Sequence, residues 1–381
     1  MSSRIGHALS IQLFGESHGK SVGVTLDGLP AGLFLPMDEI NAFIQRRASR
    51  GSALSTGRVE SDQPILLSGV YRDFTTGQPL TAIFENADTH SADYDFLPDH
   101  PRPGHADYPA TIKSAGFDDL RGSGHHSGRL TLPYAFAGAV AMQLLATLDI
   151  KVRAHILSVG DIKEASVNAM NPALTAQCLS ADAYTPWFDE AVGARMSEAI
   201  LSAKRAGDSL GGVVEVFATG APVGLGAPYF DGFEAVAAQH FFSIPAVKGV
   251  EFGVGFEAAK LRGSEYNDPY TLQEGQIKTT RNSAGGLLGG LTNGMPILAR
   301  VAFRPTPSIG LLQQTVSLSE FCEQSFQVHG RHDPCVALRA VPVVESALAL
   351  TLCELWLERR GHAPLSVFQA PEQANRNCLP I

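Results

Sequence analysis

The chain alternates short apolar runs with glycine- and proline-rich turns, a pattern typical of many short β-strands. Its 38 glycines and 23 prolines interrupt the apolar runs often enough to keep most of them at strand length. Short strands of this kind usually pair into sheets that are packed on one face. The strands expected from these runs cover residues 22–26, 65–70, 80–85, 213–219, 250–256 and 297–303.

Four longer stretches carry apolar residues at helical spacing instead. Residues 133–148 are apolar nearly all round, which predicts a buried helix, and residues 343–360 predict a second, long and apolar helix. Residues 189–205 are amphipathic, and a shorter helix is expected from Pro36 to Arg47. Each of these stretches is bounded by a residue that starts or stops helices.

Strands and helices do not alternate regularly, which favours an α+β fold over strict βαβ repetition. The sequence contains no internal repeat and no linker, so we predict a single domain over residues 1–381. Residues 98–124 show little regular pattern. A long loop of this kind in a compact domain is usually functional.

The charge and cysteine content narrow the function classes. A net charge of −9 argues against binding to nucleic acid or to an anionic membrane. The five cysteines are odd in number and scattered, which excludes a disulfide framework and fits a reducing compartment. With no signal-like start and no uninterrupted apolar run of spanning length, we expect a cytoplasmic protein.

Six glycine-bounded loops concentrate Arg, His, Ser and Thr against this acidic background. The first places a carboxylate, a hydroxyl and an imidazole within three residues, Glu16 to His18. Imidazole can transfer a proton near neutral pH, and arginine recognises phosphate and carboxylate. We therefore expect these loops to meet at one anion-binding pocket for a small molecule. The loops cover residues 15–19, 102–107, 121–131, 282–290, 304–308 and 330–334.

Other familiar motifs do not fit. The chain has no Gly-x-x-x-x-Gly-Lys-Ser/Thr sequence, and no predicted strand leads into the Gly-x-Gly element at residues 122–124. His125 and His126 are adjacent, so they form a poor metal pair, and an anion-binding role is the better interpretation. We expect no metal site.

Six ordered motifs extend from one end of the chain to the other, and together they resemble the chorismate synthase family. The first runs from residue 15 (GESHG) through the DGLP at residues 27–30. The others are residues 102–108 (RPGHADY), 207–212 (GDSLGG), 246–251 (AVKGVE), 284–290 (AGGLLGG) and 330–342 (GRHDPCVALRAVP).

This resemblance implies a single-domain β-α-β sandwich with long buried helices and a homotetramer. It also implies a reaction, the 1,4-elimination of phosphate from 5-enolpyruvylshikimate 3-phosphate to give chorismate. The family requires reduced FMN although the reaction has no net redox change, and NADPH is a source of electrons for that flavin in some members. A substrate with one phosphate and two carboxylates would explain arginine-rich loops on an acidic protein.

The resemblance also assigns roles to individual residues. His18 would protonate the departing phosphate, His105 would protonate the flavin near N1, and Asp333 would assist proton removal through flavin N5. Substrate binding would involve Ser17, Arg47, Arg129 and Arg339. The matched flavin-binding positions are His125, His126, Ser127, Pro245, Ala246, Gly289, Arg304, Pro305, Thr306, Pro307, Ser308 and Arg331.

The third loop departs from the family pattern. His125 and His126 replace an Arg-Ser pair, and Ala53 stands where the family usually has Arg. Imidazole carries only an optional charge where guanidinium carries a permanent one. We therefore hypothesise that His125 makes flavin affinity depend on pH, with compensation by other hydrogen-bond donors as the alternative.

Two competing functions remain open at this point. One is a flavin- or anion-binding paralogue that has weakened or lost catalysis, which the altered arginine positions would favour. The other is a nicotinamide-binding oxidoreductase, which lacks support because no dinucleotide-binding fingerprint is present. Release of phosphate from the substrate would separate the lyase from both.

Overall fold

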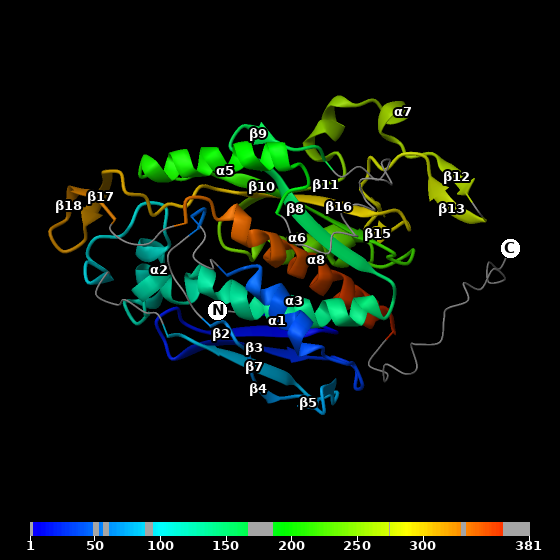
Figure 1. Cartoon of the computed structure of the whole chain (residues 1–381), viewed down its shortest axis with the longest axis horizontal. Helices are drawn as coiled ribbons and strands as arrows, with labels where there is room; N and C mark the ends of the chain where they lie inside the picture. Colours follow the sequence, from blue (N-terminus) through cyan, green and yellow to red (C-terminus); the bar gives the residue numbers. More distant parts are fainter. Residues whose placement is uncertain are drawn as a thin grey trace.

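Two antiparallel five-stranded sheets enclose a layer of buried helices (Figure 1). The computed structural model describes residues 3–48, 53–55, 61–87, 94–166, 186–273, 275–328 and 333–360. The first sheet has the order β1-β2-β3-β7-β4. Its strands are β1 (Arg4–Ile5), β2 (Ser10–Gly15), β3 (Ser21–Asp27), β7 (Leu80–Glu85) and β4 (Ile65–Ser68).

The second sheet has the order β11-β16-β10-β8-β9 and forms the opposite layer. The long central strands β8, β10 and β16 are buried along most of their length, as expected for strands covered on both faces. The five strands are β11 (Val247–Phe252), β16 (Ile297–Phe303), β10 (Gly212–Thr219), β8 (Lys151–Val159) and β9 (Ile162–Lys163).

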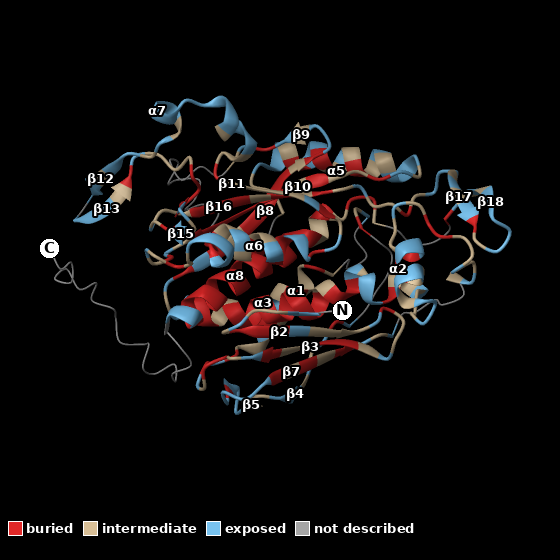
Figure 2. Ribbon diagram, turned by 180° about the vertical axis from the view of Figure 1, so that it is seen from behind, coloured by how far each residue is buried: buried red, intermediate tan, exposed pale blue. Residues whose placement is uncertain are grey.

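Four helices lie between the sheets, and a fifth covers the outer face of the second sheet (Figures 1 and 2). The outer helix is α5 (Glu190–Arg205), whose first turn is capped by the Asp189 carboxylate accepting from two backbone N–H groups. The inner helices are α1 (Met37–Gln45), α3 (Thr131–Ala146), α6 (Phe233–Phe242) and α8 (Ala337–Arg360).

The helices α3 and α8 form the centre of the core. In α3 the residues are buried nearly all round, as the sequence predicted. Gly138 of α3 allows the two helices to approach closely, because a Cβ there would lie 2.1 Å from Ser346 Cβ. Helix α8 is long and apolar enough to span a membrane, but that window is entirely buried inside the protein, as expected for a core helix.

The remaining elements are short and lie outside the sandwich layers. They are the strands β5 (Val70–Tyr71), β6 (Phe74–Thr75), β12 (Tyr270–Gln273), β13 (Gln276–Thr279), β14 (Leu287–Leu288), β15 (Leu291–Thr292), β17 (Gln313–Ser317) and β18 (Cys322–Phe326) and the helices α2 (Asp107–Ser114) and α7 (Gly263–Tyr266). The 3₁₀ helices are η2 (Arg121–His126), η3 (Gly128–Leu130), η4 (Tyr229–Asp231) and η5 (Gly255–Lys260).

The predicted elements mostly match, with three corrections. The strand expected at 65–70 is divided at Gly69, whose φ of +84° breaks the extended backbone. The strand expected at 250–256 lies earlier, at Val247–Phe252, because Gly253 has a φ of +58° and begins a turn. The expectation of little regular structure at 98–124 is wrong, since α2 and η2 occupy much of it.

Candidate active site

Five of the six predicted loops meet at one cavity of about 400 Å³. It lies where the start of α3, the turn after α6 and the start of α8 come together. The fourth loop, residues 282–290, does not reach it. The predicted site residues in its wall are Ser17, Arg47, His105, His126, Ser127, Arg129, Pro245, Ala246, Arg304, Thr306, Pro307, Ser308, Asp333 and Arg339.

The wall of the cavity carries more positive than negative side chains although the whole chain is acidic. Two carboxylates, Asp62 and Asp333, lie among five arginines in its wall. An excess of guanidinium groups in a partly closed cavity suits a ligand with several negative charges. The five arginines are Arg47, Arg102, Arg129, Arg304 and Arg339.

Arg47 lies at the crowded centre of this charge cluster. Its Nε donates to Thr131 Oγ1 and its Nη2 to the Gly128 carbonyl, each at 2.7 Å, while Nη1 is 3.8 Å from Asp62. Burial, followed by the nearby charge of Arg339, lowers the pKa of Arg47 to about 9. An anionic ligand would relieve this crowding of positive charge.

Arg129 is fixed by groups from two separate segments of the chain. It is paired with Asp62, and its Nε donates to Asn86 Oδ1 at 3.0 Å. The Asn86 amide in turn donates to the Glu16 and Gly19 carbonyls, which anchors the turn between β2 and β3. Arg129 therefore ties the first predicted loop to the wall of the cavity.

His105 is held by two interlocking loops. Its Nε2 lies 2.6 Å from the Ser308 hydroxyl, and Arg304 Nη2 donates to the Gly104 carbonyl at 2.9 Å. Gly104 has a φ of +71°, and a Cβ there would lie 2.7 Å from Pro307 Cβ. Glycine is thus required for the second and fifth loops to pack this closely.

His18 does not line this cavity but packs against Tyr94, which does. The two rings meet edge to face, with centroids 5.2 Å apart, and the guanidinium of Arg102 lies 5.3 Å from the centroid of the Tyr94 ring. Tyr94 and Arg102 both line the cavity. Gly122 packs beside His18, because a Cβ at this glycine would lie 2.6 Å from His18 Nε2. Of the two predicted catalytic imidazoles, His105 therefore lines the cavity, and His18 lies beside two residues that line it.

Asp333 and Arg339 form a pair at the start of α8. Arg339 Nη1 donates to Asp333 Oδ2 at 2.7 Å, and Arg339 Nε donates to the Arg47 carbonyl at 2.9 Å. Ser55 donates to the other Asp333 oxygen at 2.8 Å. The carboxylate is thus oriented from both sides and faces the cavity.

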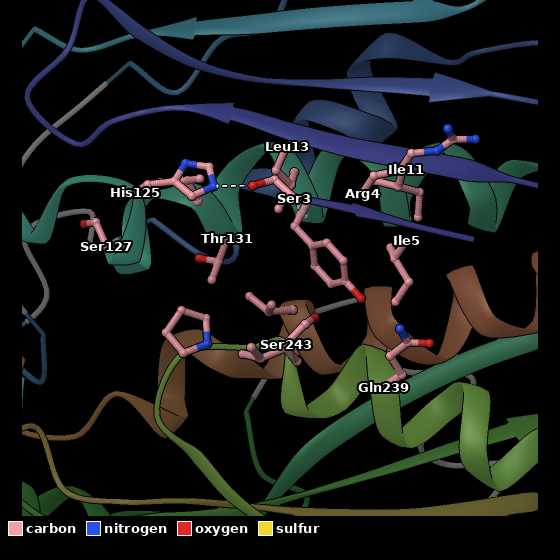
Figure 3. A pocket seen from close by; sticks show the side chains of 15 residues that line it. Ser3, Arg4, Ile5, Ile11, Leu13, His125, Ser127, Thr131, Gln239 and Ser243 are labelled. Atoms are coloured by element: carbon pink, nitrogen blue, oxygen red, sulfur yellow. Dashed lines mark hydrogen bonds between the residues drawn. The ribbon is translucent and has the colours of Figure 1, made fainter. Parts of the chain in front are cut away.

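His125 lines an adjoining cavity of about 330 Å³ instead (Figure 3). Its Nδ1 lies 2.8 Å from the Gly15 carbonyl and its Nε2 lies 2.7 Å from the Ser3 hydroxyl. A carbonyl can only accept, so Nδ1 carries the hydrogen in this arrangement. The two cavities share part of their walls at Ser127, Thr131, Ile244, Pro245 and Val343.

Three further predicted positions lie elsewhere. Gly289 is in the turn between β14 and β15, away from the cavity, and Pro305 belongs to the fifth loop without lining it. Arg331 lies outside the described residues. Within the described part of the chain, no group of three or more His, Cys, Asp or Glu residues could hold a metal ion.

Several residues of the site were not predicted. Asp62, Tyr94 and Thr131 line the cavity, and Ser55 and Asn86 support its charged groups from outside it. Arg102, Asp107 and Thr131 left a signal in the sequence, because they bound the predicted loops at residues 102–107 and 121–131. The other contacts join residues far apart in the chain, which no local pattern reveals.

The protein is thus an α+β sandwich with an arginine-lined cavity whose chemistry suits a small anionic ligand. Residues 9–357 match the family model described as chorismate synthase. A chorismate synthase from Pyrococcus abyssi is 48% identical over 93% of this chain and 98% of its own length, and one from Dehalococcoides mccartyi is 43% identical over 97% and 100%. A crystal structure of chorismate synthase superposes with a TM-score of 0.74 at 30% identity, covering 96% of each chain.

The chain belongs to the chorismate synthase family. The family resemblance and the sandwich fold predicted from the sequence are both confirmed. So is the enzyme class, a chorismate-forming lyase of the shikimate pathway, and the family needs a reduced flavin. None of these comparisons favours a paralogue that has lost catalysis.

Proposed function

We propose that the cationic cavity eliminates phosphate from 5-enolpyruvylshikimate 3-phosphate, with His18, His105 and Asp333 as its catalytic residues. The observation that carries this proposal is the arrangement of five arginines and the two imidazole loops around one cavity of about 400 Å³. The substrate has one phosphate and two carboxylates, so its charge matches the excess of guanidinium groups.

The arginines bind and orient the substrate. Arg47 and Arg339 are candidates for direct contact because both line the cavity and Arg47 carries an insufficiently compensated charge. Arg129 is committed to Asp62 and Asn86, so it acts mainly by fixing the wall. Ser17, buried and in the same wall, offers a hydroxyl to the substrate.

Two imidazoles and one carboxylate donate and accept the protons of the reaction. His18 donates a proton to the leaving phosphate, which neutralises the charge that develops as the C–O bond breaks. The hydrogen bond between His105 Nε2 and the Ser308 hydroxyl fixes the direction of the imidazole ring. Asp333 accepts a proton, and Arg339 and Ser55 keep its carboxylate oriented.

The walls of the cavity suit a reduced flavin. Thr306 lines the cavity, and its Oγ1 is buried without a hydrogen-bond partner in the described part of the protein. A polar group of a bound ligand could supply that partner. Residues 304–308, together with His126, Ser127, Pro245 and Ala246, would hold FMN. When bound, FMN supplies electron density during C–O cleavage without net redox change.

The rest of the proposal follows the family. It includes a homotetramer, a cytoplasmic location and NADPH as a source of electrons for the flavin. Cys322, Cys335 and Cys353 are unbonded among the described residues, which suits a reducing compartment.

Anaerobic incubation with substrate and reduced FMN tests the proposal. Wild-type protein should release phosphate and form chorismate, and His18→Ala and His105→Ala should each lower kcat by about 10²- to 10⁴-fold. His7→Ala provides the matched histidine control and should keep the wild-type rate, because His7 is exposed and does not line the cavity. Absence of phosphate release by the wild type would favour a paralogue without catalysis.

A further inference from the structure

The Asp333 carboxylate is held from two directions that differ in their exposure to substrate. Arg339 donates to Oδ2 at 2.7 Å and itself lines the cavity. Ser55 donates to Oδ1 at 2.8 Å, is only 6% exposed and does not line the cavity. The hydroxyl therefore reaches the carboxylate from the protein side.

Lys204 of α5 fixes the segment that carries this serine. Its Nζ donates to the Ala53 carbonyl at 2.7 Å and to the Ser55 carbonyl at 3.3 Å. Lys204 belongs to α5, so this ammonium group links residues 53–55 to a regular element. Helix α5 thus helps to hold the segment that carries the Ser55 hydroxyl.

Binding of an anionic substrate affects the two donors differently. Arg339 is one of the cavity arginines, so substrate competes with Asp333 for its guanidinium. Ser55 is neutral and lies behind the carboxylate, so it keeps its hydrogen bond when substrate is bound. A hydrogen bond to the ionised carboxyl favours that form, which is the form that accepts a proton.

We infer that Ser55 is a positioning residue for Asp333, and that Lys204 holds Ser55 in place from α5. The inference rests on the proposed role of Asp333 as a proton acceptor. Ser55 does not touch the substrate. It keeps the carboxylate ionised and aimed at the cavity while Arg339 is shared with the substrate.

Ser55→Ala tests this inference in the full-length protein. We expect kcat to fall about tenfold with KM within about twofold, because one hydrogen bond to a charged group is lost after substrate has bound. In the plot of kcat against pH, the midpoint of the acidic limb should move to a higher pH by about one unit. Ser55→Thr keeps the hydroxyl and should restore both values, and Ser202→Ala on the exposed side of α5 should match the wild type.

Lys204→Met should produce the same changes in weaker form, about threefold in kcat, because the serine remains but its segment is released. Lys204→Arg should recover most of this loss. Lys260→Met provides the matched control, since Lys260 lies in an exposed pair with Glu257 far from the segment.

A second measurement does not depend on activity. In cofactor-free protein, Ser55→Ala should lower Tm more at pH 7 than at pH 4, because the hydroxyl binds the ionised carboxylate more strongly than the protonated one. If the variant is too impaired for kinetics, this difference in Tm still tests whether the Ser55 hydroxyl binds the ionised Asp333 carboxylate; equal losses at the two pH values would contradict it.

The outcomes separate this inference from the proposed function. If wild-type protein releases no phosphate, the proposed function fails. The contact between Ser55 and Asp333 is then tested only by the difference between the Tm losses at pH 7 and pH 4. If the wild type is active, the inference is overturned by a Ser55→Ala variant with unchanged kcat and acidic limb. Equal impairment of Ser55→Ala and Ser55→Thr would overturn it too, because the hydroxyl would then be irrelevant.

Discussion

Arg102 and Asp107 form a buried ion pair, with Arg102 Nε and Nη2 each 2.7 Å from a carboxylate oxygen of Asp107. Both residues are at most 4% exposed. Burial opposes ionisation of Asp107, but the hydrogen bonds and charge of Arg102 outweigh it and keep the pKa of Asp107 below its usual value. The pair closes the loop that carries His105 and places Arg102 against Tyr94.

Asp107→Asn should destabilise the protein by about 3–5 kcal/mol, because it leaves the Arg102 charge buried without its counter-charge. Urea unfolding at pH 7 measures this change. Asp119→Asn is the matched control, since Asp119 pairs with Arg121 in the same way but at a more exposed site. An Asp107→Asn cost no larger than that of the control would show that the ion pair contributes little.

The elements that could be predicted were those whose pattern reflects their packing. Strands β7 and β16 were predicted to the residue, because their apolar runs are buried and bounded by turns. Strand β8 was not predicted, since His155 interrupts its apolar run; the ring is fully buried and lies 3.1 Å from Glu215 of β10. Helix α2 was missed because it leaves apolar residues such as Ile112 exposed, so it has no clear buried stripe.

The site was predictable as a set of loops but not as a network. Glycine, arginine and histidine in one loop indicate anion binding because their chemistry is local. The pairs that orient them are not local: Arg129 meets Asp62 and Asp333 meets Ser55 only after folding. A single sequence carries no periodicity that joins such positions.

Anion affinity should fall above pH 9. The pKa of Arg47 is lowered to about 9 by burial and by Arg339, so its positive charge is lost as the pH rises through that value. Sulfate keeps a constant charge over this range, and calorimetric titration should show its affinity falling by up to about tenfold per pH unit above pH 9. Arg47→Gln should bind sulfate more weakly and lose this slope; a variant with the wild-type slope would assign it to another group.

Flavin affinity should be higher at pH 6 than at pH 8 if His125 acts as hypothesised. His125 lines the cavity next to the active site, and Ser127 belongs to the walls of both cavities. A charge on His125 would therefore act on the active site across this common wall. Titration of FMN at the two pH values measures the effect, and His125→Arg should abolish the difference. Equal affinities, unaffected by the substitution, would contradict the hypothesis.

Acid should destabilise the protein through His240. Burial lowers the pKa of His240 to about 4, and its Nδ1 lies 2.9 Å from the Tyr134 hydroxyl. Between about pH 6.5 and pH 4 the unfolded chain binds the proton and the folded chain does not, so stability falls as the pH drops through this window. His240→Gln removes the titrating group, so the stability of the wild type relative to this variant should fall by about 3 kcal/mol from pH 7 to pH 4. A constant difference across that range would refute the assignment.

Gly138→Ala should destabilise the core by about 1–3 kcal/mol, because the added methyl group would force α3 and α8 apart. The Cβ would lie 2.1 Å from Ser346 Cβ, and neither helix can yield without moving other buried side chains. Ser346→Gly removes the opposing Cβ and Oγ but leaves the Ser346 Cα, 2.5 Å from the added Cβ, so it relieves part of the clash. The double variant should therefore be more stable than the sum of the two single changes predicts. Gly263→Ala is the control, since a Cβ at Gly263 would meet no atom within 4 Å. If the two single costs simply add, the contact between these helices does not set their spacing.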